Sequence, residues 1–207
     1  MRRGCMLLWL LAAGQACAAT WSLEGSLGAA YHARTRLTIE QGGQESLAFD
    51  ARYATQAFDS PLYYALRVGR WEADGAWELS LIHDKLYLRN PPPEVESLSI
   101  SHGFNLLTVN RALRSDTFIY RFGAGVIVTH PEGRVRGVSY DGPYDLAGVV
   151  ALAGLSKRLY LDKSWFLLGD LAATVGYAKT KADGTPDLTL RVPHAAIHGL
   201  LGIGVDF

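Results

Sequence analysis

Cysteine is almost absent from this chain of 207 residues. The sequence contains two cysteines, Cys5 and Cys17, and both precede Ala19. Residues 19–207 therefore offer no disulfide and no cysteine-based zinc site. An excess of one charge is also lacking, because 20 basic and 20 acidic residues give a formal net charge of zero. This balance argues against the basic surface of a nucleic-acid-binding protein.

A long apolar run is lacking as well. No stretch has the roughly 20 consecutive apolar residues that a membrane-spanning helix needs. The apolar run 6–13 is shorter, follows Arg2 and Arg3, and is itself followed by small residues. This order predicts a secretory signal peptide over residues 1–18. The domain 19–207 is then exported, as either a soluble all-β domain or a transmembrane β-barrel.

Alternating polar and apolar residues are abundant in this domain. Between residues 118 and 129, for example, Tyr120 and Phe122 alternate with Arg121 and Gly123. This period of two predicts strands with one apolar face. Eight strands are expected, over residues 21–39, 62–71, 76–88, 98–110, 118–129, 144–158, 165–177 and 192–207.

The connections between these strands alternate in length. The longer, polar ones are expected at 42–60, 89–96, 131–143 and 179–190, and the shorter ones at 72–75, 111–117 and 160–164. Residues 47–53 could be a separate strand, but an even strand number favours an extension of the first hairpin above the membrane. Long loops on one side and short turns on the other are typical of outer-membrane barrels. The predicted fold is therefore all-β: an eight-stranded antiparallel up-and-down transmembrane β-barrel with both termini periplasmic.

The last residues, Leu201 to Phe207, alternate in polarity and end in an aromatic side chain. This ending resembles the final strand of bacterial outer-membrane proteins, whose terminal aromatic residue is recognised by the barrel-assembly machinery. The whole domain resembles small outer-membrane β-barrels. The resemblance implies a monomer in the bacterial outer membrane that contacts lipopolysaccharide and other lipids, uses Phe207 as its assembly signal and needs no cofactor. It selects no activity, because one fold serves many functions.

Five charged residues are expected to face the barrel lumen near the periplasmic ends of their strands: Glu24, Arg67, Glu78, Arg121 and Asp170. Eight strands enclose a lumen just wide enough for side chains to fill. Charges in such a lumen must pair to offset their lost hydration. We therefore expect a structural ion-pair network, and a path for protons or small ions is the alternative.

Three histidines, His32, His194 and His198, are expected to line the lumen toward its outer mouth, together with Arg34 and Arg36. Residues four apart on a strand are separated by roughly 13 Å, because each residue rises about 3.3 Å. His194 and His198 could then chelate a metal only through a bridge to His32. Polar lining of the mouth is the simpler interpretation.

A second pair of histidines is expected on the lipid-facing wall near the outer leaflet. A hairpin symmetric about the prolines at 91–93 places His83 directly opposite His102. Facing residues have Cβ atoms about 4.5–5.5 Å apart, so the imidazoles could share a proton, a phosphate oxygen or a metal. The same register directs Asn105 into the lumen. His83 and His102 are thus candidate acid/base residues of a lipid-modifying enzyme.

Three further residues are weaker candidates on the same wall. His130 has the same parity nearer the outer loop, and Lys85 and Tyr87 could bind a headgroup phosphate. Polar groups are costly in contact with hydrocarbon. The alternative is therefore that these strands have left the hydrocarbon and that the residues lie among lipid headgroups.

The stretch His102-Gly103-Phe104-Asn105 resembles the His-x-Ser-Asn stretch of the outer-membrane lipid A deacylases. That family places its catalytic His and Ser on the lipid-facing wall. His102 and Asn105 match the family, but Phe104 stands where the family has its nucleophile. Deacylation requires this nucleophile, so the resemblance does not carry the activity over.

Three functions therefore remain open for the expected barrel. The first is a non-enzymatic envelope component that acts through its outer loops. The second is an enzyme that modifies outer-leaflet lipid through His83 and His102, and the third is a narrow conduit or small-ligand binder that uses the lumen histidines.

Overall fold

The computed structural model describes residues 19–207, so the expected signal peptide lies outside the described residues. No helix within residues 19–207 is long and apolar enough to cross a membrane. The described chain is a single sheet of thirteen strands. They are β1 (Thr20–His32), β2 (Thr35–Gln41), β3 (Leu47–Ala51), β4 (Tyr53–Ala54), β5 (Tyr64–Glu72), β6 (Gly75–Leu88), β7 (Val95–Arg114), β8 (Ile119–Thr129), β9 (Glu132–Val135), β10 (Val138–Asp141), β11 (Asp145–Tyr160), β12 (Trp165–Ala182) and β13 (Leu188–Asp206).

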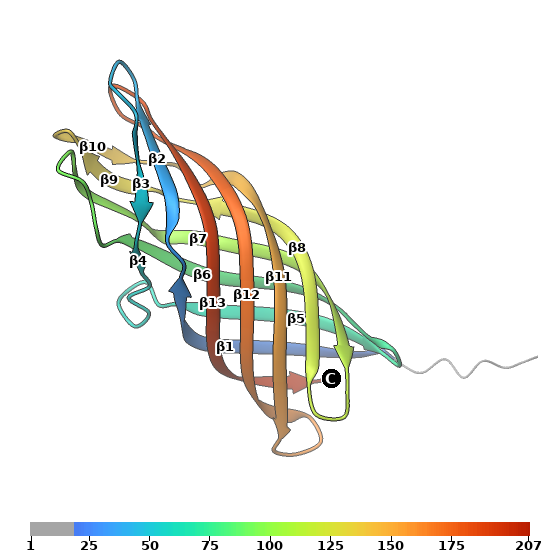
Figure 1. The fold of residues 1–207 in the computed structure, drawn as a ribbon. Helices are drawn as coiled ribbons and strands as arrows, with labels where there is room; N and C mark the ends of the chain where they lie inside the picture. Colours follow the sequence, from blue (N-terminus) through green and yellow to red (C-terminus); the bar gives the residue numbers. More distant parts are fainter. Residues whose placement is uncertain (1–18) are drawn as a thin grey trace, which may run out of the picture.

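Eight of these strands close into a barrel (Figure 1). The order of hydrogen-bonded neighbours is β1, β5, β6, β7, β8, β11, β12 and β13, and β13 pairs again with β1. All of these pairings are antiparallel. The predicted eight-stranded up-and-down barrel is therefore confirmed.

The other five strands extend the sheet beyond the barrel, on the side of the long connections. β2 pairs with both β13 and β3, so the first hairpin rises above the barrel wall. β9 pairs with β7 and β10 and forms a second raised hairpin, and the short β4 pairs with β6. Most of the segment 47–53 is thus the returning arm of the extended first hairpin, which is the preferred interpretation of the sequence.

Large apolar side chains cover the outside of the barrel. Exposed aromatic residues lie toward the short turns (Trp21, Trp77, Tyr120, Tyr160 and Trp165) and toward the long connections (Tyr31, Tyr144 and Tyr177). Exposed leucines, valines and isoleucines occupy the band between them, for example Leu27, Val149 and Leu171. An exposed apolar band between two aromatic girdles is the surface of a membrane-spanning barrel.

Trp71 lies at a strand end near the short turns, where an aromatic residue would be expected in this girdle, but it is not part of it. The side chain is buried, and its Nε1 donates a hydrogen bond to Ser22 Oγ inside the barrel at 2.9 Å. Trp71 shares its parity with Arg67, which also points inward. The Ser22 hydroxyl gives the indole N–H a hydrogen-bond acceptor in the lumen, so the ring can be buried there.

The inward and outward faces of the first predicted strand change places partway along it. Leu37 and Ile39 share the odd parity of the exposed Tyr31, which by regular alternation would place them on the lipid-facing side, but both are buried in the interior core. The strand is interrupted between β1 and β2, and this interruption reverses the parity. Arg34 and Arg36 consequently point outward and are exposed, which corrects their predicted place in the lumen.

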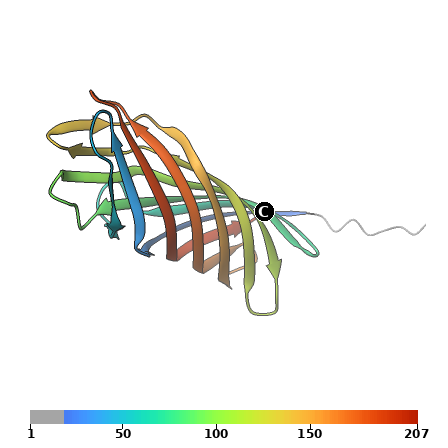
Figure 2. The same cartoon turned by 45° about the horizontal axis from the view of Figure 1, so that its top comes forward.

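The short turns and the C-terminus gather at one end of the barrel, opposite the β2–β3 and β9–β10 hairpins (Figures 1 and 2). The backbone of Phe207 exchanges two hydrogen bonds with that of Trp21, at 2.8 and 2.9 Å. These bonds complete the seam between the first and last barrel strands. The Phe207 side chain remains 71% exposed.

Candidate functional site

The five charged residues predicted for the lumen are all buried and are joined by ion pairs. Arg67 contacts Glu24 at 2.5 Å and Asp170 at 2.6 Å. Arg121 contacts Glu78 at 2.7 Å and Glu24 at 3.4 Å. The strands β1, β5, β6, β8 and β12 each supply one member, so the network ties together walls that are distant in sequence.

Further members of this network, Arg158, Ser156 and Asp206 among them, were missed by sequence reasoning. Arg158 donates to Glu24 at 2.6 Å and to Asp206 at 3.1 Å. Ser156 donates to Asp170 at 2.7 Å and accepts a hydrogen bond from Arg121. Both residues have inward parity on β11, but the continuous apolar run 149–152 obscured the alternation of that strand. Three arginines then face four carboxylates, those of Glu24, Glu78, Asp170 and Asp206.

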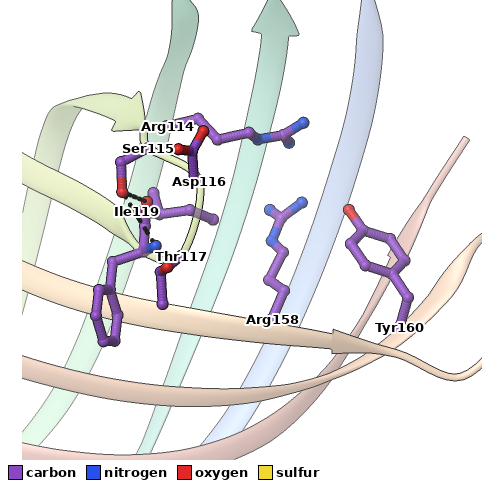
Figure 3. Close-up of a pocket in the computed structure, with 8 residues that line it drawn as sticks. Arg114, Ser115, Asp116, Thr117, Ile119, Arg158 and Tyr160 are labelled. Carbon is purple, nitrogen blue, oxygen red and sulfur yellow. Dashed lines mark hydrogen bonds between the residues drawn. The ribbon is translucent and has the colours of Figure 1, made fainter.

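Arg158 closes the lumen at the end with the short turns. Its guanidinium lies over the rings of Trp71 and Phe166, 4.7 and 4.2 Å from their centroids. A shallow pocket of about 230 Å³ opens beside it and is lined by the 114–118 turn and Tyr160 (Figure 3). Arg158 is one of the residues that line the pocket, and its hydrogen bonds to Glu24 and Asp206 hold its guanidinium in place.

A polar layer of histidines lies further along the lumen. His32 Nε2 is 2.9 Å from Asp84 Oδ2, and both side chains are almost completely excluded from solvent. Thr174 Oγ1 bridges His194 Nε2 at 2.8 Å and His198 Nε2 at 2.7 Å. Asp84 was not identified from the sequence as a partner of these histidines, although its inward parity on β6 was available as a signal.

The His194 and His198 rings lie closer together than residues four apart on a strand would be from backbone spacing alone. The rings of His194 and His198 have centroids 6.3 Å apart, because both side chains lean toward Thr174. Ligand atoms of His32, Asp84 and His194 all lie within 4.8 Å of one another, so these three residues could hold a metal. His198 is instead held by the Tyr63 hydroxyl at 2.6 Å. A metal role for His32, His194 and His198 stays a prediction.

The predicted pairing of His83 with His102 is wrong. His83 lies opposite Asn105 in the ladder, and its Nδ1 is 2.8 Å from Asn105 Oδ1. Its ring stacks on Tyr64 of the neighbouring strand, with centroids 4.9 Å apart. Asn105 was predicted to point into the lumen, whereas Phe104 occupies that position and is fully buried.

An irregularity in the β6–β7 ladder explains this error. Asp84 pairs with Phe104, but Leu86 pairs with Ile100, so one residue on β6 faces three on β7. The two extra residues displace His102 from the register that a symmetric hairpin requires. Ile100, Phe104 and Leu106 also face inward, whereas the predicted register required the even-numbered residues of this strand to face lipid. A catalytic role for His83, His102 or His130 stays a prediction.

Lys85 is buried rather than presented to lipid headgroups. Its Nζ donates hydrogen bonds to the carbonyl oxygens of Gln56 and Asp59, at 2.7 and 2.9 Å, in the connection after β4. Nζ also lies 5.3 Å from the ring centroid of Tyr87. The ammonium group of Lys85 is therefore not free to bind a headgroup phosphate, as the prediction for Lys85 and Tyr87 required.

His102 and His130 do meet, on the outer rim of the barrel. Their rings lie edge to face with centroids 5.8 Å apart. Glu132 Oε1 is 3.1 Å from His102 Nδ1 and 3.4 Å from His130 Nε2. Glu132 was not singled out from the sequence, because it falls in a segment that was expected to be an irregular loop and is instead the first residue of β9.

Comparison with known proteins agrees with this architecture. No protein-family model matches the chain, and no curated protein matches it in sequence. The chain is similar to the outer membrane protein AlkL, solved by solid-state NMR in DMPC lipid bilayers, with 12% identity and a TM-score of 0.57 over 100% of this chain and 97% of AlkL. It also matches the attachment invasion locus protein Ail of Yersinia pestis (11% identity, TM-score 0.42, 91% of this chain and 97% of Ail) and Neisserial surface protein A (9%, 0.43, 92% and 99%). The likeness to AlkL shows that the chain has the fold of small bacterial outer-membrane β-barrels.

Proposed function

We propose that the protein is an integral outer-membrane barrel that does not conduct solutes and that acts at the cell surface through its two raised hairpins. In this orientation the short turns and the C-terminus are periplasmic, and the β2–β3 and β9–β10 hairpins project from the outer leaflet.

The filled lumen is the observation that carries this proposal. Arg158 and Trp71 occupy the lumen near the short turns, the ion-pair network follows, and the histidine layer lies beyond it. Beside and beyond the histidines, the fully buried apolar side chains belong to one continuous core, which includes Leu37, Ile39, Phe104, Ile127, Leu188 and Leu190. A barrel of this strand number has room for its own side chains and little else.

The raised hairpins are joined to each other, which makes them a preorganised surface rather than independent loops. The β9–β10 hairpin turns at Arg136 and Gly137, both with positive φ, as a two-residue type I′ turn requires. Arg136 donates to Gln41 Oε1 at 3.0 Å and to the Glu45 carbonyl oxygen at 2.8 Å, on the first hairpin. Gln41 also donates to the Tyr140 hydroxyl at 2.7 Å.

Conductance of the purified protein tests the first half of the proposal. Reconstituted into a planar lipid bilayer, the folded barrel should give no discrete current steps, whereas a general porin in the same bilayer should give them. Reproducible single-channel steps from the folded barrel would overturn the non-conducting assignment.

Cysteine labelling tests the orientation, because residues 19–207 contain no native cysteine. Gln44→Cys lies in the exposed β2–β3 turn, and Lys163→Cys lies in the exposed β11–β12 turn. A membrane-impermeant maleimide should label the first variant on intact cells and the second only after the outer membrane is permeabilised. The reverse pattern would place the raised hairpins in the periplasm.

A further inference from the structure

We propose that His102, His130 and Glu132, with Asp141 beside them, form a binding site for a divalent transition-metal ion of the zinc class on the outer rim of the barrel. This inference goes beyond the proposed surface role, since it assigns a ligand to one place on that surface. The four residues come from β7, the β8–β9 connection, β9 and β10, so a bound ion would cross-link the raised hairpin to the barrel wall.

The distances between the ligand atoms fit a tetrahedral ion. Glu132 Oε1 lies 3.1 Å from His102 Nδ1 and 3.4 Å from His130 Nε2, and Asp141 Oδ1 lies 3.3 Å from His130 Nε2. Ligand atoms around a tetrahedral zinc are separated by about 3.3–3.4 Å when each bond is about 2.0–2.1 Å long. The donor atoms of His102, His130 and Glu132 all fall within 4.8 Å of one another. An ion can therefore be placed among them with small side-chain shifts.

The chemistry of the donor set selects among cations. Two imidazole nitrogens and carboxylate oxygens suit zinc, copper or nickel, whereas magnesium and calcium prefer ligand sets made entirely of oxygen. Two carboxylates also balance the two charges of the ion. The site is thus expected to discriminate against the magnesium and calcium ions that are common outside cells.

The backbone and a neighbouring tyrosine hold the two histidines in place. The ring of Tyr144 stacks on His130 with centroids 4.7 Å apart, and its hydroxyl donates to the His102 carbonyl oxygen at 2.9 Å. The His130 amide donates to the Gly103 carbonyl oxygen at 3.0 Å. Such outer contacts orient metal ligands before the ion arrives.

Like charges in the ladder supply an independent reason to expect a cation. Glu132 and Asp141 are directly paired residues of β9 and β10. Asp141 is also bridged to Asp183 from the β12 side. Carboxylates directly opposite one another destabilise a sheet unless a positive charge lies between them. The imidazole of His130 is at this point, and a metal bound there would neutralise the carboxylates at any pH at which the histidine is uncharged.

Accessibility favours this site over the other histidine cluster. His32, Asp84 and His194 lie inside the lumen, hydrogen-bonded to one another or to Thr174, beneath the apolar core. The His102 side chain is 51% exposed and that of Glu132 is 36% exposed. An ion in the surrounding medium can reach the rim cluster without opening the barrel.

Zinc titration of the purified, folded barrel in detergent tests the proposal without depending on membrane orientation. Isothermal titration calorimetry of the wild-type protein should show one zinc ion bound per chain. Cobalt in its place should give the intense visible absorption bands of a tetrahedral ion. The affinity should be lost in acid, because a metal displaces the proton from each imidazole that it binds.

Substitutions then locate the ion. His102→Ala and His130→Ala should each weaken zinc binding by at least about ten-fold, since even contacts that only orient metal ligands are worth about 10–100-fold. His83→Ala, which removes a histidine outside the cluster, should leave the affinity unchanged. Tyr144→Phe keeps the stacked ring but removes the bond to the His102 carbonyl, and it should give an intermediate loss.

Two outcomes would overturn the proposal. The first is full-affinity binding by the His102→Ala/His130→Ala double variant, which would place the ion elsewhere, for instance at His32 and His194. The second is absence of saturable zinc binding to a wild-type barrel whose heat-modifiable band shows that it is folded. His102 is half exposed, whereas His130 is largely buried, so the same band must verify that each variant has folded before its affinity is compared.

Discussion

The guanidinium of Arg121 lies against the carboxylate of Glu78, with Nε 2.7 Å from Oε2, and neither side chain has any exposure to solvent. A second oxygen of Glu78 accepts from the same guanidinium at 3.1 Å. The pair sits at the centre of the lumen network, where each charge loses its hydration completely. Breaking such a pair therefore differs from breaking one at the surface.

Removing Arg121 alone should strongly destabilise the barrel. Arg121→Met leaves Glu78 buried without its main partner, and losses of this kind cost about 3–5 kcal/mol. The double variant Arg121→Met/Glu78→Met should recover part of that loss, because neighbouring sites are not additive. Urea unfolding in detergent micelles measures all members of the cycle.

Arg111→Met is the matched control for this cycle. Arg111 also pairs with a carboxylate, that of Asp74 at 2.6 Å, but the Asp74 side chain is 76% exposed. Exposed pairs contribute roughly 0–1 kcal/mol. Equal effects of the two arginine substitutions, or strictly additive effects within the Arg121–Glu78 cycle, would show that the lumen network does not behave as a buried unit.

A side chain at Gly125 should prevent β7 and β8 from pairing normally. A Cβ at this position would run into the Leu107 carbonyl oxygen and come within 2.7 Å of Thr108 Cα, both of which are backbone atoms. Backbone cannot move aside as a flexible side chain can, so we expect Gly125→Ala to cost about 1–3 kcal/mol or more. Gly199→Ala is the control, because nothing lies within 4 Å of its added Cβ. The fraction of folded, heat-modifiable band after refolding should fall for the first variant only.

The barrel itself could be predicted from the sequence because alternation is local information. Each strand reports its own two faces, and the inward positions of Glu24, Arg67 and Arg121 follow from neighbours one or two residues away. The contacts among these residues then follow from closure of the barrel, because a charge buried in so narrow a lumen must pair with an opposite charge.

The lumen positions of His32, His194 and His198 follow from the alternation in the same way, but the place of His102 and the face of the residues after His32 do not, because they depend on interruptions of the alternation. The break after His32 reversed the face of Leu37, and the irregular pairing beside Asp84 moved His102 away from His83. The break after His32 has no sequence mark of this kind, whereas Gly103, with φ of +157°, lies within the irregular segment of β7 and is the signal that could have indicated it. Asp84 and Glu132 were overlooked for a related reason. Each is recognised as a histidine partner only when the fold brings it beside a histidine from another strand.

The pairing of β2 with β13 should weaken in acid. Arg191 donates a hydrogen bond to Glu40 at 2.8 Å across this pair and thereby lowers the pKa of Glu40 below its usual value of 4.5. A carboxyl whose pKa is lowered in the folded state contributes stability above its ordinary pKa, and this stability is lost as the pH falls through the folded value. Amide-exchange protection around Thr38–Gln41, corrected for intrinsic rates, should therefore decline below pH 4.5. The decline should be small, because both side chains are about 40% exposed.

Glu40→Gln provides the control for this acid effect. The variant keeps a hydrogen-bond acceptor for Arg191 but has no group that titrates, so its protection should not vary over the same pH range. A parallel decline in the wild-type protein and the variant would assign the acid sensitivity to other groups of the raised hairpin.

The Phe207 side chain should matter for assembly in the cell more than for the stability of the finished barrel. It is 71% exposed, so its removal sacrifices little packing, and the backbone bonds between residue 207 and Trp21 do not depend on the side chain. Phe207→Asp should therefore refold from urea into detergent micelles with nearly the same midpoint as the wild-type protein. In cells, the same variant should accumulate less in the outer membrane and appear as a protease-sensitive periplasmic form, as expected if the terminal aromatic residue is the recognised signal. Phe207→Tyr keeps an aromatic ring and should restore the outer-membrane level. Equal losses in micelles and in cells would show that the residue acts through stability, and normal outer-membrane levels of Phe207→Asp would show that it is no signal at all.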